Sequence, residues 1–208
     1  MFELLSADTP NGKKVSILLE ELGLQYKVTK INIYKGDQFK PSFSKISPFN
    51  KIPVLKDVKT KKYIFESGAI LIYLGEKYKK FYDKKNRLKI LQWLMAQMAY
   101  VGPMFGQHHQ FHHYNHGKSK FGEERYFKIS TQIYKDLDKR LSKSKFLACS
   151  KYTIADIATF PWVARHEIHD IGLKKFKNLT RWFDLISKRK AVIKGYDFMN
   201  RGEIIPKP

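Results

Sequence analysis

The sequence predicts an α/β domain followed by an all-α domain, and three observations support this. Short apolar runs with the period of strands alternate with helical periods between residues 2 and 78. After about residue 87 only helical periods remain, and the segment between, residues 78–86, is charged and aromatic. We therefore expect one domain over residues 1–80 and another over residues 87–208, each large enough to form its own core.

The first domain is predicted to follow the order β-α-β-β-β-α in a mixed sheet. Its expected strands are residues 2–6, 26–33, 52–57 and 61–66, and its expected helices are residues 11–23 and 67–78. Gly23 suits the end of the first helix, because glycine tolerates positive φ. The last two strands flank a charged turn and should form an antiparallel hairpin. Ser67 is the expected N-cap of the second helix, with Glu66 directly before it.

The second domain is predicted from three amphipathic stretches. Residues 87–102 carry one apolar face, which is expected to consist of Leu88, Leu91, Leu94, Met95 and Met98. Residues 123–143 place apolar side chains three or four apart at Tyr126, Ile129, Ile133, Leu137 and Leu141. Residues 152–168 begin with Thr153 and Asp156, three apart, a spacing that allows a capping box.

Composition limits the possible partners. The net charge is +21, an excess that could attract nucleic acid, a membrane surface or small anions. The basic residues are spread from Lys13 to Lys207, which favours a solvated surface, and zinc-finger spacings, RNA-motif aromatics and phosphate-binding glycine loops are missing. Neither a membrane span nor a secretory signal is apparent, and the single cysteine, Cys149, fits a reducing compartment. We expect a cytoplasmic protein that binds neither membrane nor nucleic acid.

Three motifs in register resemble the glutathione transferase family. They are "NKIPVL" (50–55), "FESGAILIYL" (65–74) and "YTIADIATFPW" (152–162). This resemblance implies a thioredoxin-like N-terminal domain and a helical C-terminal domain. More narrowly, "TPNGKKVSILLEE" (9–21), "KGDQFKPSFSKISPFNKIP" (35–53) and "GPMFGQHHQFHH" (102–113) look like the nu class and its relatives, the bacterial glutathione-dependent disulfide-bond reductases.

The resemblance implies how glutathione is held at its γ-glutamyl end and its centre. Ile52-Pro53 should be a cis bond, and the backbone N–H and C=O of Ile52 should pair with the ligand backbone. A trans proline that merely ends a loop is the alternative. Ser67 and the free amides of its helix should hold the γ-glutamyl carboxylate, while Glu66 accepts from the ammonium. A plain helix cap is the alternative there.

Three further ligand contacts follow from the same resemblance. Gln38 and Lys51 should reach the glycyl carboxylate, unless each is only a solvated loop residue. Arg125 should contact the ligand from the second domain. Its alternative is an ion pair with Glu123 or Glu124.

The start of the first helix raises the question of the nucleophile. Residues 9–12 read Thr-Pro-Asn-Gly and contain neither thiol nor tyrosine, so the reactive sulfur should come from glutathione itself. A thiol has a reference pKa near 8.5, and the Thr9 hydroxyl, the Asn11 amide and the helix N-terminus could lower it. A purely structural cap, or a role for Ser6, remains the alternative. Cys149 is expected to be structural.

The resemblance implies a glutathione-dependent disulfide-bond reductase that acts as a homodimer. The same enzyme could also reduce hydroperoxides. Its alternatives are a transferase that conjugates small electrophiles and a transferase-like module that contacts RNA or protein. Five histidines between His108 and His116 could bind zinc or nickel, form a polar wall near the second substrate, or simply pack. We favour the polar wall and expect glutathione as bound substrate and no metal.

Overall fold

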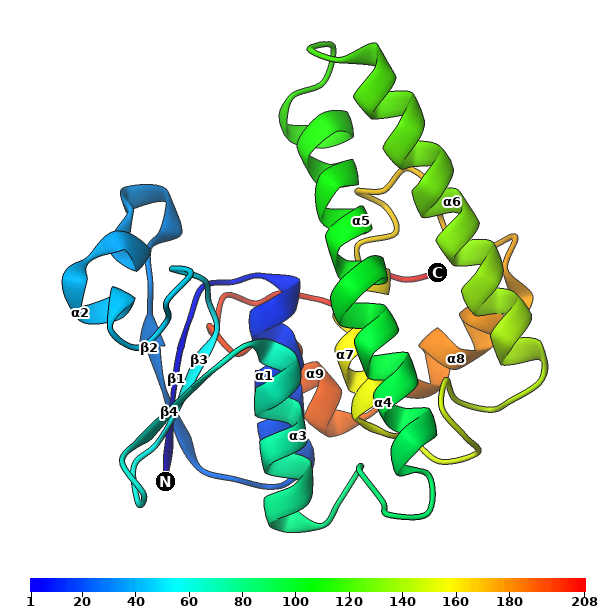
Figure 1. Ribbon diagram of the computed structural model, residues 1–208. Helices are drawn as coiled ribbons and strands as arrows, with labels where there is room; N and C mark the ends of the chain where they lie inside the picture. Colours follow the sequence, from blue (N-terminus) through cyan, green and yellow to red (C-terminus); the bar gives the residue numbers. More distant parts are fainter. The chain divides into compact units, whose positions relative to one another are not determined.

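The computed structural model describes residues Met1–Pro208, which form two compact units (Figure 1). Unit 1 comprises residues 1–80 and 189–204, and unit 2 comprises residues 81–188 and 205–208. The last helix, α9 (Lys190–Tyr196), belongs to unit 1 because it packs on the first helix. These units show which segments pack together. The domains expected from the sequence, residues 1–80 and 87–208, concern independent folding and stay a prediction.

Unit 1 contains a four-stranded mixed sheet. Its strands are β1 (Phe2–Ser6), β2 (Tyr26–Lys30), β3 (Val54–Asp57) and β4 (Lys62–Phe65), in the order β2-β1-β3-β4. β1 pairs in parallel with β2 and antiparallel with β3, and β3 and β4 form the predicted antiparallel hairpin. Leu4 lies opposite both Val28 and Leu55, so the centre of the sheet is apolar. The predicted mixed α/β architecture is confirmed.

β2 is shorter than predicted, because the chain turns after Lys30. The side chain of Asn32 accepts a hydrogen bond from the backbone N–H of Lys35 and starts the short helix η1 (Ile33–Lys35). η2 (Asp37–Phe39) and α2 (Pro41–Ser44) follow. The alternating pattern up to Ile33 therefore overestimated the strand by three residues.

Helices α1 (Pro10–Glu21) and α3 (Ser67–Tyr78) lie side by side on one face of the sheet (Figure 1). α1 ends at Glu21 with Leu22 as its C-cap, so Gly23, the predicted cap, lies one residue beyond; its φ is +67° and its N–H donates to the Glu20 carbonyl. On its other side α1 meets α9 at Gly195, where a Cβ would lie 2.6 Å from Ile17 Cα. The absence of a side chain at Gly195 therefore allows α9 to pack closely on α1.

Unit 2 is all helical, as predicted. α4 (Arg87–Ala96), the π-helix η3 (Gln97–Val101), α5 (Gly102–His108) and the π-helix η4 (His109–Tyr114) follow one another directly. α6 (Lys120–Ser142) returns alongside α5 (Figure 1), and α7 (Ile154–Val163) and α8 (Lys177–Ser187) complete the unit. The helices of the chain include none that is long and apolar enough to cross a bilayer.

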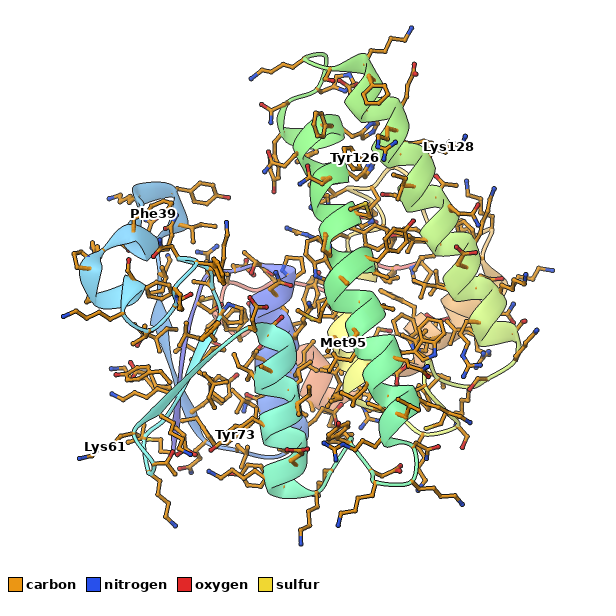
Figure 2. All side chains as sticks on the ribbon, in the orientation of Figure 1. Phe39, Lys61, Tyr73, Met95, Tyr126 and Lys128 are labelled. Carbon is orange, nitrogen blue, oxygen red and sulfur yellow. The ribbon has the colours of Figure 1, made fainter.

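The predicted face of α4 was wrong in part. Its buried residues are Ile90 and Leu94, whereas Leu88 is 71% exposed and Met95 (Figure 2) is 46% exposed. The inward row continues through Gln97, a polar residue that is only 1% exposed. A search for apolar periodicity cannot select a buried glutamine, so it selected its methionine neighbours instead.

The stripe predicted for α6 is confirmed in part, and the capping box predicted for α7 is confirmed. α6 buries Ile133, Leu137 and Leu141, whereas Tyr126 and Ile129 are half-buried. At the start of α7, Thr153 and Asp156 form the capping box. Asp156 also accepts from the Leu147 backbone N–H (2.8 Å) and from Trp182 Nε1 (2.9 Å).

Candidate functional site

The start of α1 places Thr9 and Asn11 together. Thr9 is the N-cap, and its Oγ1 accepts from the Gly12 N–H at 3.2 Å. Pro10 occupies the first helical position, and Asn11 follows, half-buried. The cap bond uses an oxygen lone pair, so the Thr9 hydroxyl hydrogen can still be donated to another acceptor. Capping and thiolate stabilisation are therefore compatible at Thr9, and the latter remains a prediction.

The loop before β3 contains the expected cis Ile52–Pro53 bond. The buried Ser47 closes this loop, because its Oγ accepts from the Lys51 N–H (3.1 Å) and donates to the Lys51 carbonyl (2.8 Å). Lys51 itself is exposed, and Ile52 is half-buried. The hydrogen bonds within the chain do not involve the backbone of Ile52, which leaves its N–H and C=O available for a ligand.

At the start of α3 the structure corrects one prediction. The N-cap is Glu66, and Ser67 is the first helical residue, with a side chain that is almost fully buried. Glu66 is exposed and has a φ of +67°, a conformation that costs a non-glycine residue about 1–3 kcal/mol and that clusters at functional sites. The N-cap therefore lies one residue before the predicted position. Capping rules favour serine over glutamate as an N-cap, so they did not predict this.

Lys14 joins this end of the site and was missed by sequence reasoning. Its Nζ lies 3.4 Å from Ser67 Oγ, and its side chain is 1% exposed. Burial lowers the pKa of Lys14 to about 7, although the Glu66 carboxylate acts in the opposite direction. A lysine pair at positions 13 and 14 was read as solvated surface. Its burial could have been predicted from its position, because Lys14 lies one helical turn before Leu18 on the buried face of α1.

Lys13 is also buried, and it ties the start of α1 to the C-terminal segment of unit 1. Its Nζ donates to the Tyr196 carbonyl at 2.7 Å, pairs with Asp8 at 2.8 Å and also pairs with Glu203. A buried ammonium with two carboxylate partners is compensated, so its burial is tolerated. Lys13 therefore braces the helix that begins at Thr9.

Gln38 is half-buried in η2, where its Nε2 donates to the Ile33 carbonyl at 3.2 Å. One of its two amide hydrogens is thus used within the chain, and the second remains for an acceptor such as a carboxylate. Contacts of Gln38 and Lys51 with a ligand stay predictions.

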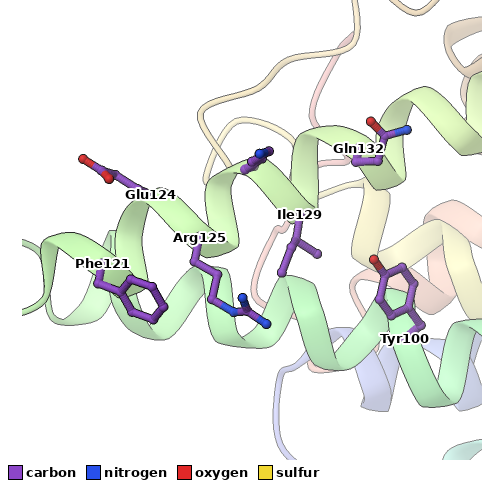
Figure 3. A pocket seen from close by; sticks show the side chains of 7 residues that line it. Tyr100, Phe121, Glu124, Arg125, Ile129 and Gln132 are labelled. Carbon is purple, nitrogen blue, oxygen red and sulfur yellow. The ribbon is translucent and has the colours of Figure 1, made fainter.

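Arg125 lies in unit 2, where its exposed side chain lines a pocket between α6 and η3 (Figure 3). Tyr100, Phe121 and Ile129 project into the same pocket. The ion pair with Glu123 or Glu124 that we considered does not form, since Glu123 pairs with His116 and Glu124 with Lys120. Its contact with a ligand is likewise a prediction.

The histidine segment divides into two groups. His108 and His109 are buried, and His108 Nε2 donates to the His169 carbonyl at 2.9 Å. Burial lowers the pKa of His109 to about 3, with the nearby Arg165 acting in the same direction. His112 is half-buried, and His113 and His116 are exposed. The polar wall near a second substrate remains a prediction.

Comparisons with known proteins found related sequences and similar structures. Family models match residues 9–77 (glutathione S-transferase, N-terminal domain) and residues 95–190 (glutathione S-transferase, C-terminal domain). The disulfide-bond oxidoreductase YfcG of Escherichia coli is 40% identical over 198 residues, which cover 92% of each chain. The disulfide-bond oxidoreductase YghU of the same organism is 35% identical and covers 93% of this chain and 73% of its own.

Two solved structures are also similar. A glutathione transferase from Burkholderia graminis, with two glutathione molecules bound per subunit, has a TM-score of 0.89 and 38% identity, covering 97% of this chain and 89% of its own. One from Pseudomonas putida, with one glutathione disulfide bound per subunit, has a TM-score of 0.86 and 38% identity, covering 94% and 90%.

Proposed function

The chain belongs to the glutathione S-transferase family, and we propose that it reduces disulfides with the thiol of bound glutathione. One observation carries the proposal: residues 9–12, at the start of α1, contain no nucleophilic thiol, and the single cysteine, Cys149, lies in unit 2. The relatives named disulfide-bond oxidoreductases and the neighbours with glutathione or its disulfide bound support it.

The γ-glutamyl end is proposed to bind at the start of α3. The carboxylate accepts hydrogen bonds from Ser67 and from free backbone amides, where the helix dipole is positive. Glu66 accepts from the ligand ammonium. Lys14, directly behind Ser67, adds a positive charge that is shielded from water and therefore acts strongly on the bound carboxylate.

The rest of the tripeptide extends along the loop before β3. The backbone of Ile52, held beside Pro53, pairs with the cysteinyl residue as an added strand would. Gln38 and Lys51 hold the glycyl carboxylate, and Arg125 supplies a contact from unit 2. This arrangement delivers the ligand sulfur to Thr9 and Asn11, where hydrogen bonds favour the thiolate.

The reaction then proceeds in two exchanges that balance. The thiolate of one glutathione attacks a sulfur of the substrate disulfide, forms a mixed disulfide and releases one substrate thiolate, which takes a proton. The thiolate of a second glutathione attacks the glutathione sulfur of the mixed disulfide, which releases glutathione disulfide and the second substrate thiol. The protein contributes donors, orientation and charge.

Hydroperoxides are proposed as further substrates of the same thiolate. Attack on the outer oxygen breaks the O–O bond, yields an alcohol and leaves glutathione sulfenic acid, which a second glutathione converts to the disulfide and water. We also propose nu-class membership, a homodimer and a cytoplasmic location, where a reduced glutathione pool can supply both thiols.

Steady-state assays separate disulfide reduction from conjugation. We expect turnover of hydroxyethyl disulfide with reduced glutathione, and little conjugation of chlorodinitrobenzene. Robust conjugation without disulfide reduction would instead support a transferase of small electrophiles. Salt-sensitive retention on RNA without affinity for glutathione would support a binding module.

A further inference from the structure

The turn between η4 and α6 gathers two imidazoles and a carboxylate. The possible ligand atoms of His112, His116 and Glu123 all lie within 4.8 Å of one another. The two imidazole rings are 5.8 Å apart and nearly perpendicular, and His116 Nδ1 lies 3.2 Å from Glu123 Oε2. None of these residues takes part in the proposed glutathione chemistry.

Backbone hydrogen bonds fix the carboxylate within this group. Gly117, with a φ of +79°, donates its N–H to Glu123 Oε1 at 2.7 Å. Ser119 caps α6 by accepting from the Gly122 N–H at 3.2 Å, so Glu123 is held in the first turn of α6. One carboxylate oxygen is thereby anchored, and the other faces His116.

Packing sets the distance between the two helical segments. A Cβ at Gly122 would lie 2.2 Å from Phe111 Cδ1, so only glycine lets η4 approach α6 this closely. Phe111 also stacks on Tyr126 with ring centroids 5.2 Å apart. His112 and Glu123 therefore lie on packed segments, and His116 lies on the turn that joins them.

The group is open on one side and supported on the other. The His116 side chain is 71% exposed, whereas those of His112 and Glu123 are 26% and 16% exposed. His112 stacks on the buried His108 at 4.7 Å, and Asp170 Oδ2 lies 3.8 Å from His112 Nε2. An ion can enter beside His116 and meet side chains that are already held in place.

We propose that His112, His116 and Glu123 form a binding site for a divalent transition-metal ion of the zinc class. Two imidazole nitrogens and one carboxylate oxygen are a common zinc ligand set, with water in the fourth position. Ligand atoms about 2.0–2.2 Å from zinc lie roughly 3.4 Å apart, so rotation of the exposed His116 ring brings the group to coordination distance. Asp170, beside His112, adds negative charge in a chain of net charge +21.

This site differs from what the sequence led us to expect. The sequence left a zinc or nickel site open but favoured a polar wall without metal. The fold places His108 and His109 inward and brings His112 and His116 together with Glu123 on α6. An ion here joins the end of η4 to the start of α6 and stabilises unit 2 by binding the folded state alone.

Titration calorimetry with zinc chloride tests the proposal, on the full chain without a polyhistidine tag. The native chain should bind one Zn²⁺ per chain, and Co²⁺ should give the absorption bands of a tetrahedral nitrogen and oxygen site. His116→Gln and Glu123→Gln should each weaken Zn²⁺ binding at least ten-fold. Glu123→Gln retains an oxygen for the Gly117 N–H, so the turn should persist.

His113→Gln is the matched control, because His113 is exposed in the same segment but lies outside the group. It should bind Zn²⁺ like the native chain. Thermal melting should show a Zn²⁺-dependent rise in Tm for the native chain and for His113→Gln, and none for Glu123→Gln. The proposal is overturned if the native chain binds no Zn²⁺, or if all three variants bind it equally.

Discussion

Thr9 and Asn11 carry the chemical part of the account at the scale of single residues. Asn11→Ala removes one donor to the ligand thiolate, so the pKa of the bound thiol should rise by about one unit, or ~1.4 kcal/mol. Turnover should fall by up to about ten-fold at neutral pH, while the KM for glutathione changes little, because the lost interaction favours the thiolate rather than binding. Ultraviolet absorbance of the thiolate, followed against pH, measures this pKa.

Thr9→Ser serves as the control, because serine keeps both the cap and the hydroxyl donor. It should retain the native pKa of the bound thiol. Equal loss of turnover and of binding in Asn11→Ala would contradict a thiolate-stabilising role.

Lys14 makes ligand affinity depend on pH. With a pKa of about 7, its ammonium is present below pH 7 and is lost above it. A bound carboxylate favours the ammonium, so binding above pH 7 requires proton uptake and should weaken by up to about ten-fold per pH unit. The dissociation constant of S-methylglutathione, which has no thiol to titrate, should therefore rise between pH 7 and 8.5.

In Lys14→Met this rise should disappear, and affinity should stay near the high-pH value of the native chain. Lys59→Met, which alters an exposed lysine in the turn between β3 and β4, should keep the native pH profile. A pH slope that survives in Lys14→Met would remove Lys14 from the proposed γ-glutamyl site.

At the scale of elements, Asp156 joins α7 to its neighbours. Its carboxylate accepts from the backbone N–H groups of Thr153 and Leu147 and from the indole of Trp182. Asp156→Ala leaves these buried donors without partners and should lower the free energy of unfolding by about 3–5 kcal/mol. Urea denaturation measures the loss. Asp136→Ala, on the exposed face of α6, should change it by under about 1 kcal/mol, and a similarly small loss for Asp156→Ala would contradict the account.

Local pattern predicted most elements, and long-range packing explains the exceptions. The hairpin, the stripe of α6 and the capping box of α7 each depend on neighbours in sequence, so periodicity and capping rules identified them. α9 is held in unit 1 by the contact of Gly195 with Ile17, far away along the chain, and no local pattern contains that contact. The burial of Gln97 also depends on packing and not on local pattern, so the predicted face of α4 was partly wrong.

The sequence predicted those residues of the candidate site that lie in family motifs. Resemblance indicated Ile52, Pro53, Glu66 and Ser67, and the cis bond is confirmed. Resemblance did not indicate Lys14, because a lysine next to another lysine is usually solvated. Burial of such a residue is decided by what α3 places against α1, and only the folded chain shows this.

At the scale of the whole molecule, the central claim is that the reacting sulfur arrives with glutathione. The chain has one cysteine, Cys149, whose half-buried side chain points to the Lys151 carbonyl in unit 2. A cysteine-free protein should therefore be a complete catalyst.

The most direct measurement is the rate of glutathione-dependent reduction of hydroxyethyl disulfide by Cys149→Ser, compared with the native chain. The account predicts equal kcat and equal KM for glutathione. Loss of disulfide reduction in a variant that still binds glutathione and melts like the native chain would show that the protein supplies the nucleophile, and would contradict the account.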